Sequence, residues 1–144
     1  MLPKWHILLG AIFTFIIWIS SPEISLLYLS LIFFSSFLMD FDHYAVSVLK
    51  TGNISLFDSF DYHKKQTEIE DKEIKKGIRK KGDFHLFHTI EFHILIGLLM
   101  FLWTGFFYVF IGMIFHSMLD LISLIYAGKM HRREYFLLNW MRFK

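Results

Sequence analysis

Long apolar segments that contain ionisable residues are the feature that most constrains this chain. Of its 144 residues, 55% are hydrophobic and 19% are aromatic, and the mean hydropathy is +0.46. This composition is typical of a small polytopic membrane protein rather than of a soluble domain of the same size. A charged side chain inside a bilayer costs about 3 kcal/mol or more unless it is paired, hydrated or bound to a metal. The acidic and histidine residues within these segments are therefore the first candidates for function.

Four segments are apolar enough to cross a membrane, namely residues 5–19, 24–39, 84–103 and 106–127. A spanning helix needs about 20 apolar residues, so we expect the first two segments to be tilted or extended by their flanks. The breaks within each pair are short, which predicts two antiparallel helical hairpins. We therefore expect an all-α integral membrane fold with four transmembrane helices. Residues 1–144 form a single membrane domain with an insertion at residues 44–83.

The basic residues divide unequally between the connecting segments. Lys4 precedes the first apolar segment, nine basic residues lie between the second and third, and five follow the fourth, whereas the two short connections contain none. By the positive-inside rule, both termini and residues 44–83 are cytoplasmic. The N-terminus has the charge and apolar run of a signal peptide but lacks an Ala-x-Ala-like exit, so we expect it to be retained as a span.

The charged part of the insertion, Lys64 to Lys81, is either a solvated charged helix or partly disordered loop, or an interfacial lid. Glu68 with Lys72, and Asp71 with Lys75, have the i,i+4 spacing that supports a solvated helix. Its basic run also fits an interfacial lid that holds anionic headgroups.

The topology brings most ionisable residues of the apolar segments to the cytoplasmic side, where four helices can build one site. The chain has no cysteine, which excludes Cys-ligated zinc and iron–sulfur clusters. A metal site would have to use imidazoles and carboxylates. The candidate ligands are His6, Asp40, Asp42, His43, His85, His88, Glu91, His116 and Asp120.

Helical spacing groups these candidates. His116 and Asp120 are one turn apart and share a face. His85, His88 and Glu91 repeat at i, i+3 and i+6, so His88 is flanked by the other two. Asp40, Asp42 and His43 close the second segment, where the helix dipole disfavours acidic side chains and a cation would stabilise them. His93 points away from this ladder and fits a ligand, a hydrogen-bond partner of a ligand or a packed histidine, whereas His63 and His131 lie in solvent-facing charged stretches.

Four elements in this order resemble those of the small membrane-bound metal-dependent hydrolases of the YdjM type. They are His6, Asp40-Phe41-Asp42-His43, His88-Thr89 and His116-x3-Asp120. The family typically has Asp-x-Asp-His, Thr-His-Ser and a late His-x3-Asp, and this chain departs from the second with His88-Thr89-Ile90. The last element is also similar to part of the zinc shell of zinc-dependent phospholipase C and the S1/P1-type nucleases. Their His-x3-Glu element is absent here, and His88-x2-Glu91 is the nearest equivalent.

The resemblance implies a membrane-embedded hydrolase with one to three divalent ions, zinc before manganese or iron. We expect metal-activated water to cleave a phosphoester or pyrophosphate bond of a lipid, with no nucleic-acid partner, in a prokaryotic cytoplasmic membrane and on its cytoplasmic side. Asp42 and Glu91 are the catalytic candidates, Asp42 as a bridging ligand or a general base. Lys80, Lys81 and Arg132 are the expected headgroup contacts.

Two further functions stay open at this point. A di-iron oxygenase is suggested by His85-x2-His88-x4-His93, although the paired histidine boxes of such enzymes are missing. A metal transporter or sensor needs no catalysis, but transport predicts polar residues through the full membrane depth, and the outer halves of the helices are almost purely apolar. A pair of histidines holding haem is disfavoured by the acidic residues in the cluster.

Overall fold

The computed structural model describes residues 3–142, which are helical and contain no strand. Three helices are long and apolar enough to cross a membrane: Pro3–Ser20, Leu26–Thr51 with a tight turn inside it, and Gly105–Tyr126. Large apolar side chains on these helices are exposed, among them Phe15 at 55% and Ile19 at 64%. Exposed apolar faces of this length indicate contact with lipid, so the chain is associated with a membrane.

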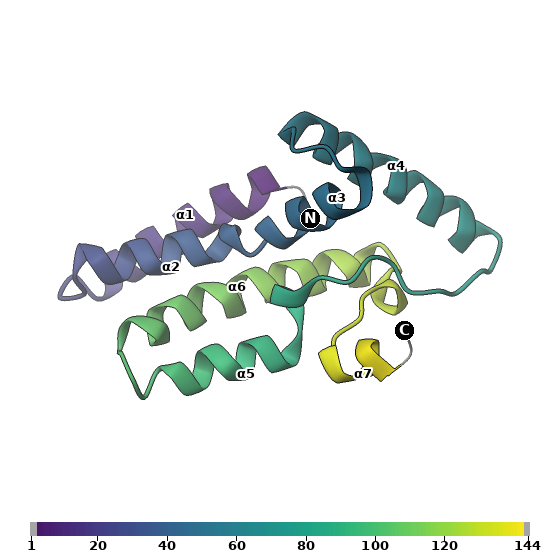
Figure 1. The fold of residues 1–144 in the computed structure, drawn as a ribbon. Coiled ribbons are helices and arrows are strands. Elements are labelled where there is room, and N and C mark those ends of the chain that lie inside the picture. The colour runs from purple at the N-terminus through teal and green to yellow at the C-terminus, as the bar shows by residue number, and fades with distance from the viewer. Residues whose placement is uncertain (1–2, 143–144) are drawn as a thin grey trace.

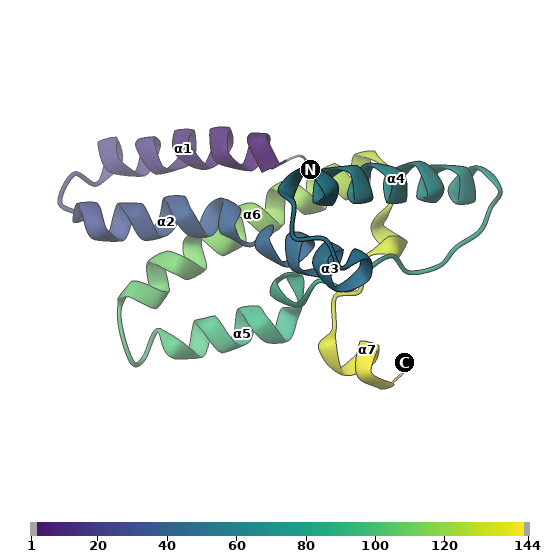
Figure 2. The same ribbon diagram turned by 45° about the horizontal axis from the view of Figure 1, so that its top comes forward.

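Small residues allow the three long helices to approach closely. The helix α2 (Leu26–Leu38) packs between α1 (Pro3–Ser20) and α6 (Gly105–Tyr126), as Figures 1 and 2 show. A methyl group on Gly10 would overlap the Ser36 hydroxyl, and one on Gly112 would overlap the Ile32 carbonyl oxygen. Small residues at such contacts are how helices pack in membranes, where apolar burial gives little net gain.

The second apolar segment continues beyond the end expected from the sequence. A tight turn at Met39–Asp40 is followed by α3 (Phe41–Thr51), so the helical segment reaches Thr51 instead of stopping at residue 39. The turn is tightened by i→i+3 bonds from Asp40 N to Phe37 O, 3.1 Å, and from His43 N to Asp40 O, 3.1 Å. This change of direction puts Asp40 at the junction, where its side chain faces α1 and α6.

The third apolar segment is a much shorter helix than expected. Residues 84–103 were predicted to be helical throughout, but α5 (Ile90–Leu99) has ten residues, or roughly 15 Å at 1.5 Å per residue. That is about half of a ~30 Å hydrocarbon core. Thr89 starts the helix by accepting the Phe92 N–H, 3.3 Å. The preceding 3₁₀ turn η1 (Leu86–His88) therefore removes His85 and His88 from the helix that carries Glu91.

The charged insertion contains a helix, α4 (Leu56–Lys75), which covers only residues 64–75 of the charged stretch 64–81 and is joined to the C-terminal segment. That segment contains the 3₁₀ turn η2 (Met130–Arg132) and α7 (Leu137–Arg142). Arg132 donates to Glu73, 2.7 Å, and Lys129 pairs with Asp71, 2.6 Å. Hydrogen bonds from Lys80 and Arg132 lower the pKa of Glu73. In Figure 1, α4 and α7 lie at the end of the molecule opposite to the α1–α2 and α5–α6 turns.

The best-buried side chains of the described fold are unusually polar. The small apolar core consists of Met39, Ile96 and Met113 with neighbouring aromatic rings. By contrast, the side chains with less than 2% exposure include His6, His116, Asp120, Thr89 and Ser36. Burying histidines and a carboxylate where the packing is tightest requires partners for them, and these partners form the candidate site.

Candidate metal centre

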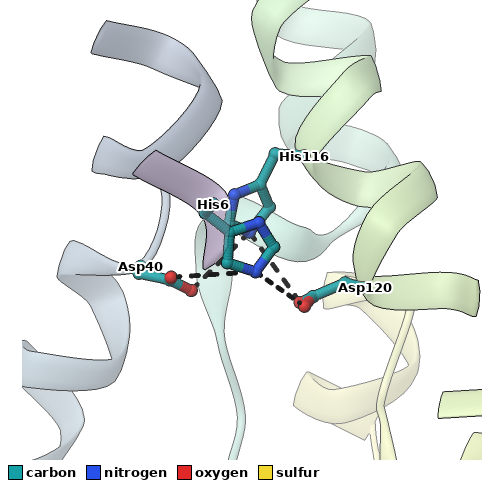
Figure 3. A group of neighbouring side chains, drawn as sticks. All are labelled: His6, Asp40, His116 and Asp120. Carbon is teal, nitrogen blue, oxygen red and sulfur yellow. Dashed lines mark hydrogen bonds and ion pairs between the residues drawn. The ribbon is translucent and has the colours of Figure 1, made fainter. Parts of the chain in front are cut away.

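Four ligand-type side chains meet between α1, the α2–α3 junction and α6 (Figure 3). One ligand atom from each of His6, Asp40, His116 and Asp120 lies within 4.8 Å of the others. His6 Nε2 is 3.1 Å from Asp120 Oδ1, and His116 Nε2 is 3.6 Å from Asp40 Oδ1. The two imidazole rings are stacked with centroids 3.9 Å apart. This first group combines two imidazoles with two carboxylates, a set of side chains that could hold a metal ion.

A second group lies beside the first and consists of Asp40, His43 and His88. His88 comes from η1 and points its Nε2 atom at the first group, 3.1 Å from His116 Nε2 and 3.5 Å from Asp120 Oδ2. His43 Nε2 is 3.7 Å from Asp40 Oδ1. The Asp40 carboxylate therefore belongs to both groups.

Hydrogen bonds on the far side of two imidazoles determine what they present to the site. His116 Nδ1 is 2.9 Å from the Ser36 carbonyl oxygen, which only accepts, so this nitrogen carries the proton. His88 Nδ1 is 3.0 Å from Asp42 Oδ2, and the same reasoning applies. In the neutral rings both Nε2 atoms then hold lone pairs, and these face each other at 3.1 Å. Two facing lone pairs repel unless a proton or a metal cation lies between them.

Asp42 orients His88 and leads to a third group. Its Oδ2 atom accepts from His88 Nδ1 and also from Phe87 N, 2.9 Å. A carboxylate behind a ligating imidazole fixes the tautomer and raises the basicity of the ligand. Its other oxygen lies 3.7 Å from His85 Nδ1 in the group Asp42, His43 and His85. Burial lowers the pKa of His85 to about 4, so this imidazole is neutral near pH 7 and able to ligate.

Glu91 does not join these groups, although the sequence placed it among the ligands and the catalytic candidates. Its two oxygens accept the backbone N–H groups of Leu137, 2.9 Å, and Leu138, 3.2 Å. The carboxylate thus holds the N-terminus of α7, whose free N–H groups and dipole favour an anion. The short α5 explains the difference, because a continuous helix from residue 84 would have aligned Glu91 with His88.

The expected headgroup contacts are engaged elsewhere, and a neighbouring residue reaches the site. Lys80 pairs with Glu73, and Lys81 donates to the Arg133 carbonyl oxygen, 2.8 Å. Arg132 is 4% exposed and bound to Glu73. Arg133, one residue further along, donates from Nη2 to Asp120 Oδ2 at 2.8 Å. The end of η2 determines which of the two arginines faces the cluster.

Three contributors to the site were missed in the sequence. The Ser36 carbonyl has no side-chain signature, and Arg133 was passed over for Arg132. His63, expected in solvent, donates to the His43 carbonyl oxygen at 2.9 Å and connects α4 to the site. His93 is bonded to the Thr89 carbonyl oxygen, 2.8 Å, and to Ser117 Oγ, 2.9 Å, and is not a member of the three groups.

Comparison with known proteins identifies no relative. No protein-family model, no curated protein and no solved structure matches this chain. The resemblance to the YdjM-type hydrolases therefore stays a prediction, and the function has to be argued from the site itself.

Proposed function

We propose that this chain is a membrane-embedded metal-dependent hydrolase that cleaves a phosphoester or pyrophosphate bond of a lipid. The observation that supports the metal is the pair of Nε2 atoms of His88 and His116, 3.1 Å apart with their Nδ1 protons committed to other acceptors. The carboxylates of Asp40 and Asp120 converge on the same space. A divalent ion there relieves both the lone-pair repulsion and the buried negative charge.

The ligand atoms favour zinc, with manganese and iron as alternatives, because imidazole nitrogen and carboxylate oxygen suit all three. A divalent ion in such a site lowers the pKa of a coordinated water toward ~7 and polarises a phosphoryl oxygen. Asp42 holds His88 in the ligating tautomer, and the Ser36 carbonyl does the same for His116. Because Asp40 and His43 each belong to two groups, the cluster has donors for more than one ion.

The charges of the site favour an anionic substrate. Three carboxylates, those of Asp40, Asp42 and Asp120, surround the cluster, and the Arg133 guanidinium stands at its edge. One divalent ion together with Arg133 balances the carboxylates, so a second ion leaves net positive charge for a phosphate. A planar guanidinium matches phosphate oxygens geometrically. A lipid headgroup is the phosphate available where membrane helices end, on the side that the basic residues predict to be cytoplasmic.

Metal analysis of the purified protein tests the centre. We expect at least one equivalent of zinc or manganese in the unaltered chain and a loss of bound metal in His116→Ala and Asp120→Asn. His131→Gln is the control, because His131 is outside the three groups. Preparations that never contain metal would contradict the proposal, since the facing nitrogens would then share a proton instead.

Activity is measured separately by phosphate release from vesicles that contain dodecyl phosphate or dodecyl pyrophosphate. We expect release that stops on chelation and returns on addition of zinc or manganese. Stoichiometric iron with an oxygen-sensitive spectrum, and no phosphate release, would instead indicate an oxygenase.

A further inference from the structure

A groove of about 420 Å³ runs between α5 and α6 beside the metal centre. This volume lies in the ~300–1,000 Å³ range of small-molecule pockets. Its wall is mostly apolar and includes Ile90, Ile94, Gly97, Phe110, Ile114 and Leu121. Apolar grooves in a membrane protein are filled by hydrocarbon, so the question is which molecule occupies this one.

The two ends of the groove differ in chemistry. Because α5 and α6 are antiparallel (Figure 1), Gly97 lies opposite Phe110, with 3.8 Å between an added Cβ and the ring. The Ile90 end adjoins the C-terminal segment, since Ile90 N donates to the Tyr135 carbonyl oxygen at 2.9 Å. At this end the wall includes His88 and Arg133, both of which belong to the surroundings of the metal centre. The groove is thus apolar over nearly all of its surface, and His88 and Arg133 at one end connect it to the candidate metal centre.

Two polar side chains in the middle of the wall, His93 and Ser117, satisfy each other. His93 Nδ1 donates to the Thr89 carbonyl oxygen, which leaves Nε2 to accept the Ser117 hydroxyl proton at 2.9 Å. This pair therefore needs no hydrogen bond from the molecule in the groove, and a hydrocarbon chain can lie over it without leaving a polar group unpaired.

We propose that the groove binds a single hydrocarbon chain of a lipid phosphate and directs its phosphate to Arg133 and the metal centre. This inference rests on the proposed function and specifies its substrate. The groove extends roughly 10 Å from Ile90 to Gly97 at ~1.5 Å per residue, and α5 is about as long as one leaflet of the hydrocarbon core is thick. A lipid tail therefore lies along α5 in the direction it already has in the membrane, with its charged head at the end where His88 and Arg133 lie.

The groove serves positioning more than affinity. A tail that leaves the bilayer for the groove exchanges one apolar environment for another and gains little from burial. Fixing the tail instead orients the headgroup, and a displacement of about 1 Å at a reacting centre costs up to about 100-fold in rate.

Photolabelling tests the occupant by a readout independent of hydrolysis. The probe is dodecyl phosphate with a diazirine at the end of its chain, presented in phosphatidylcholine vesicles to the full-length protein. We expect label on peptides of α5 and α6. Ile94→Trp, which fills the groove, reduces this labelling about tenfold or more. The matched control is Leu95→Trp, because Leu95 is the next residue on α5, is also half exposed, and does not line the groove.

Hydrolysis of two probes, one with a lipid chain and one without, separates this inference from the proposed function. In Ile94→Trp we expect slower phosphate release from dodecyl phosphate, unchanged release from methyl phosphate and unchanged bound metal. Equal labelling of Ile94→Trp and Leu95→Trp would overturn the proposal that the groove binds the lipid chain. Weak labelling of α5 and α6 in the unaltered chain, together with loss of a dimer in Ile94→Trp, would also overturn it. A second copy of the chain would then occupy the groove. Label in the groove with no hydrolysis of either probe would support the groove and contradict the hydrolase.

Discussion

At the scale of single residues, Asp42 connects the local fold to the chemistry of the site. One oxygen of its carboxylate accepts the Phe87 backbone N–H and the His88 imidazole N–H, so the same atom holds η1 in place and sets the tautomer of His88. Ordering a ligand in this way is the usual contribution of groups behind a metal shell. Asp42 therefore positions His88 through one oxygen, while its role as a bridging ligand or general base stays a prediction.

Removing the charge of Asp42 should weaken metal binding without removing a ligand. In Asp42→Asn the amide oxygen can still accept from Phe87 N and His88 Nδ1, but without a negative charge it no longer raises the basicity of the imidazole. We expect zinc affinity, measured by competition with a coloured chelator, to fall about 10- to 100-fold. Glu91→Gln is the comparison, because Glu91 binds α7 and not the cluster, and its zinc affinity should stay as in the unaltered chain. A larger loss of zinc affinity in Glu91→Gln than in Asp42→Asn would contradict the role given to Asp42.

The sequence predicts site residues where an ionisable side chain lies in an apolar helix, because few roles other than pairing or metal binding account for it. His6, Asp40, His116 and Asp120 were recognised because imidazoles and carboxylates in apolar helices need a partner, and the structure brings them together. Arg133 and the Ser36 carbonyl were not recognised. The first depends on the direction in which η2 ends, and the second is a backbone group that every residue has.

At the scale of helices, glycine decides how closely α2 and α6 approach. An added Cβ at Gly112 meets the Ile32 carbonyl oxygen and the Ser36 backbone nitrogen, neither of which can move alone. At Gly97 the only neighbour is the Phe110 ring at 3.8 Å, an ordinary contact distance. The two glycines lie in apolar helices of one hairpin but have opposite packing requirements.

Alanine at these two positions should give opposite results. We expect Gly112→Ala to lower the free energy of unfolding by about 1–3 kcal/mol, the usual cost of overpacking. Gly97→Ala should be neutral or stabilising by up to about 1 kcal/mol, because alanine favours helix over glycine. Unfolding in mild detergent, followed by circular dichroism, measures both. Equal destabilisation would show that α2 and α6 are not packed as described.

Helix type was easier to predict than helix ends. The apolar segments and the charged helix were recognised from their composition and spacing. The α2–α3 turn and the start of α5 were not, because they depend on two short-range features: the i→i+3 bonds around Asp40 and the Thr89 cap. These two departures shape the site, since they place Asp40 and His88 beside His116 instead of on separate regular helices.

At the scale of the whole molecule, the charge distribution and the fold divide the chain in the same way. The α1–α2 and α5–α6 turns lie at one end of the molecule, and α4 and α7 lie at the other (Figure 1). The two turns belong to connections without a basic residue, whereas α4 and its flanks contain most of the lysines. An asymmetry of this kind orients membrane proteins with the basic end in the cytoplasm. The metal centre would then open toward the cytoplasmic leaflet.

Single cysteines can test this orientation cleanly, because the chain has none of its own. We expect Glu23→Cys and Thr104→Cys, both in exposed turns, to react in intact cells with a maleimide that cannot cross the membrane. Lys76→Cys, at the exposed end of α4, should react only after the cells are opened, and Lys72→Cys serves as a second position on the same helix.

Thr104 is the more informative of the two outer positions, since α5 reaches through about half of the hydrocarbon core. Protection of Thr104→Cys alone would mean that the α5–α6 turn stays within the bilayer, so that α5 and α6 enter and leave on the same side without a full crossing. Labelling of the α4 cysteines in intact cells would reverse the orientation and place the metal centre on the outer face.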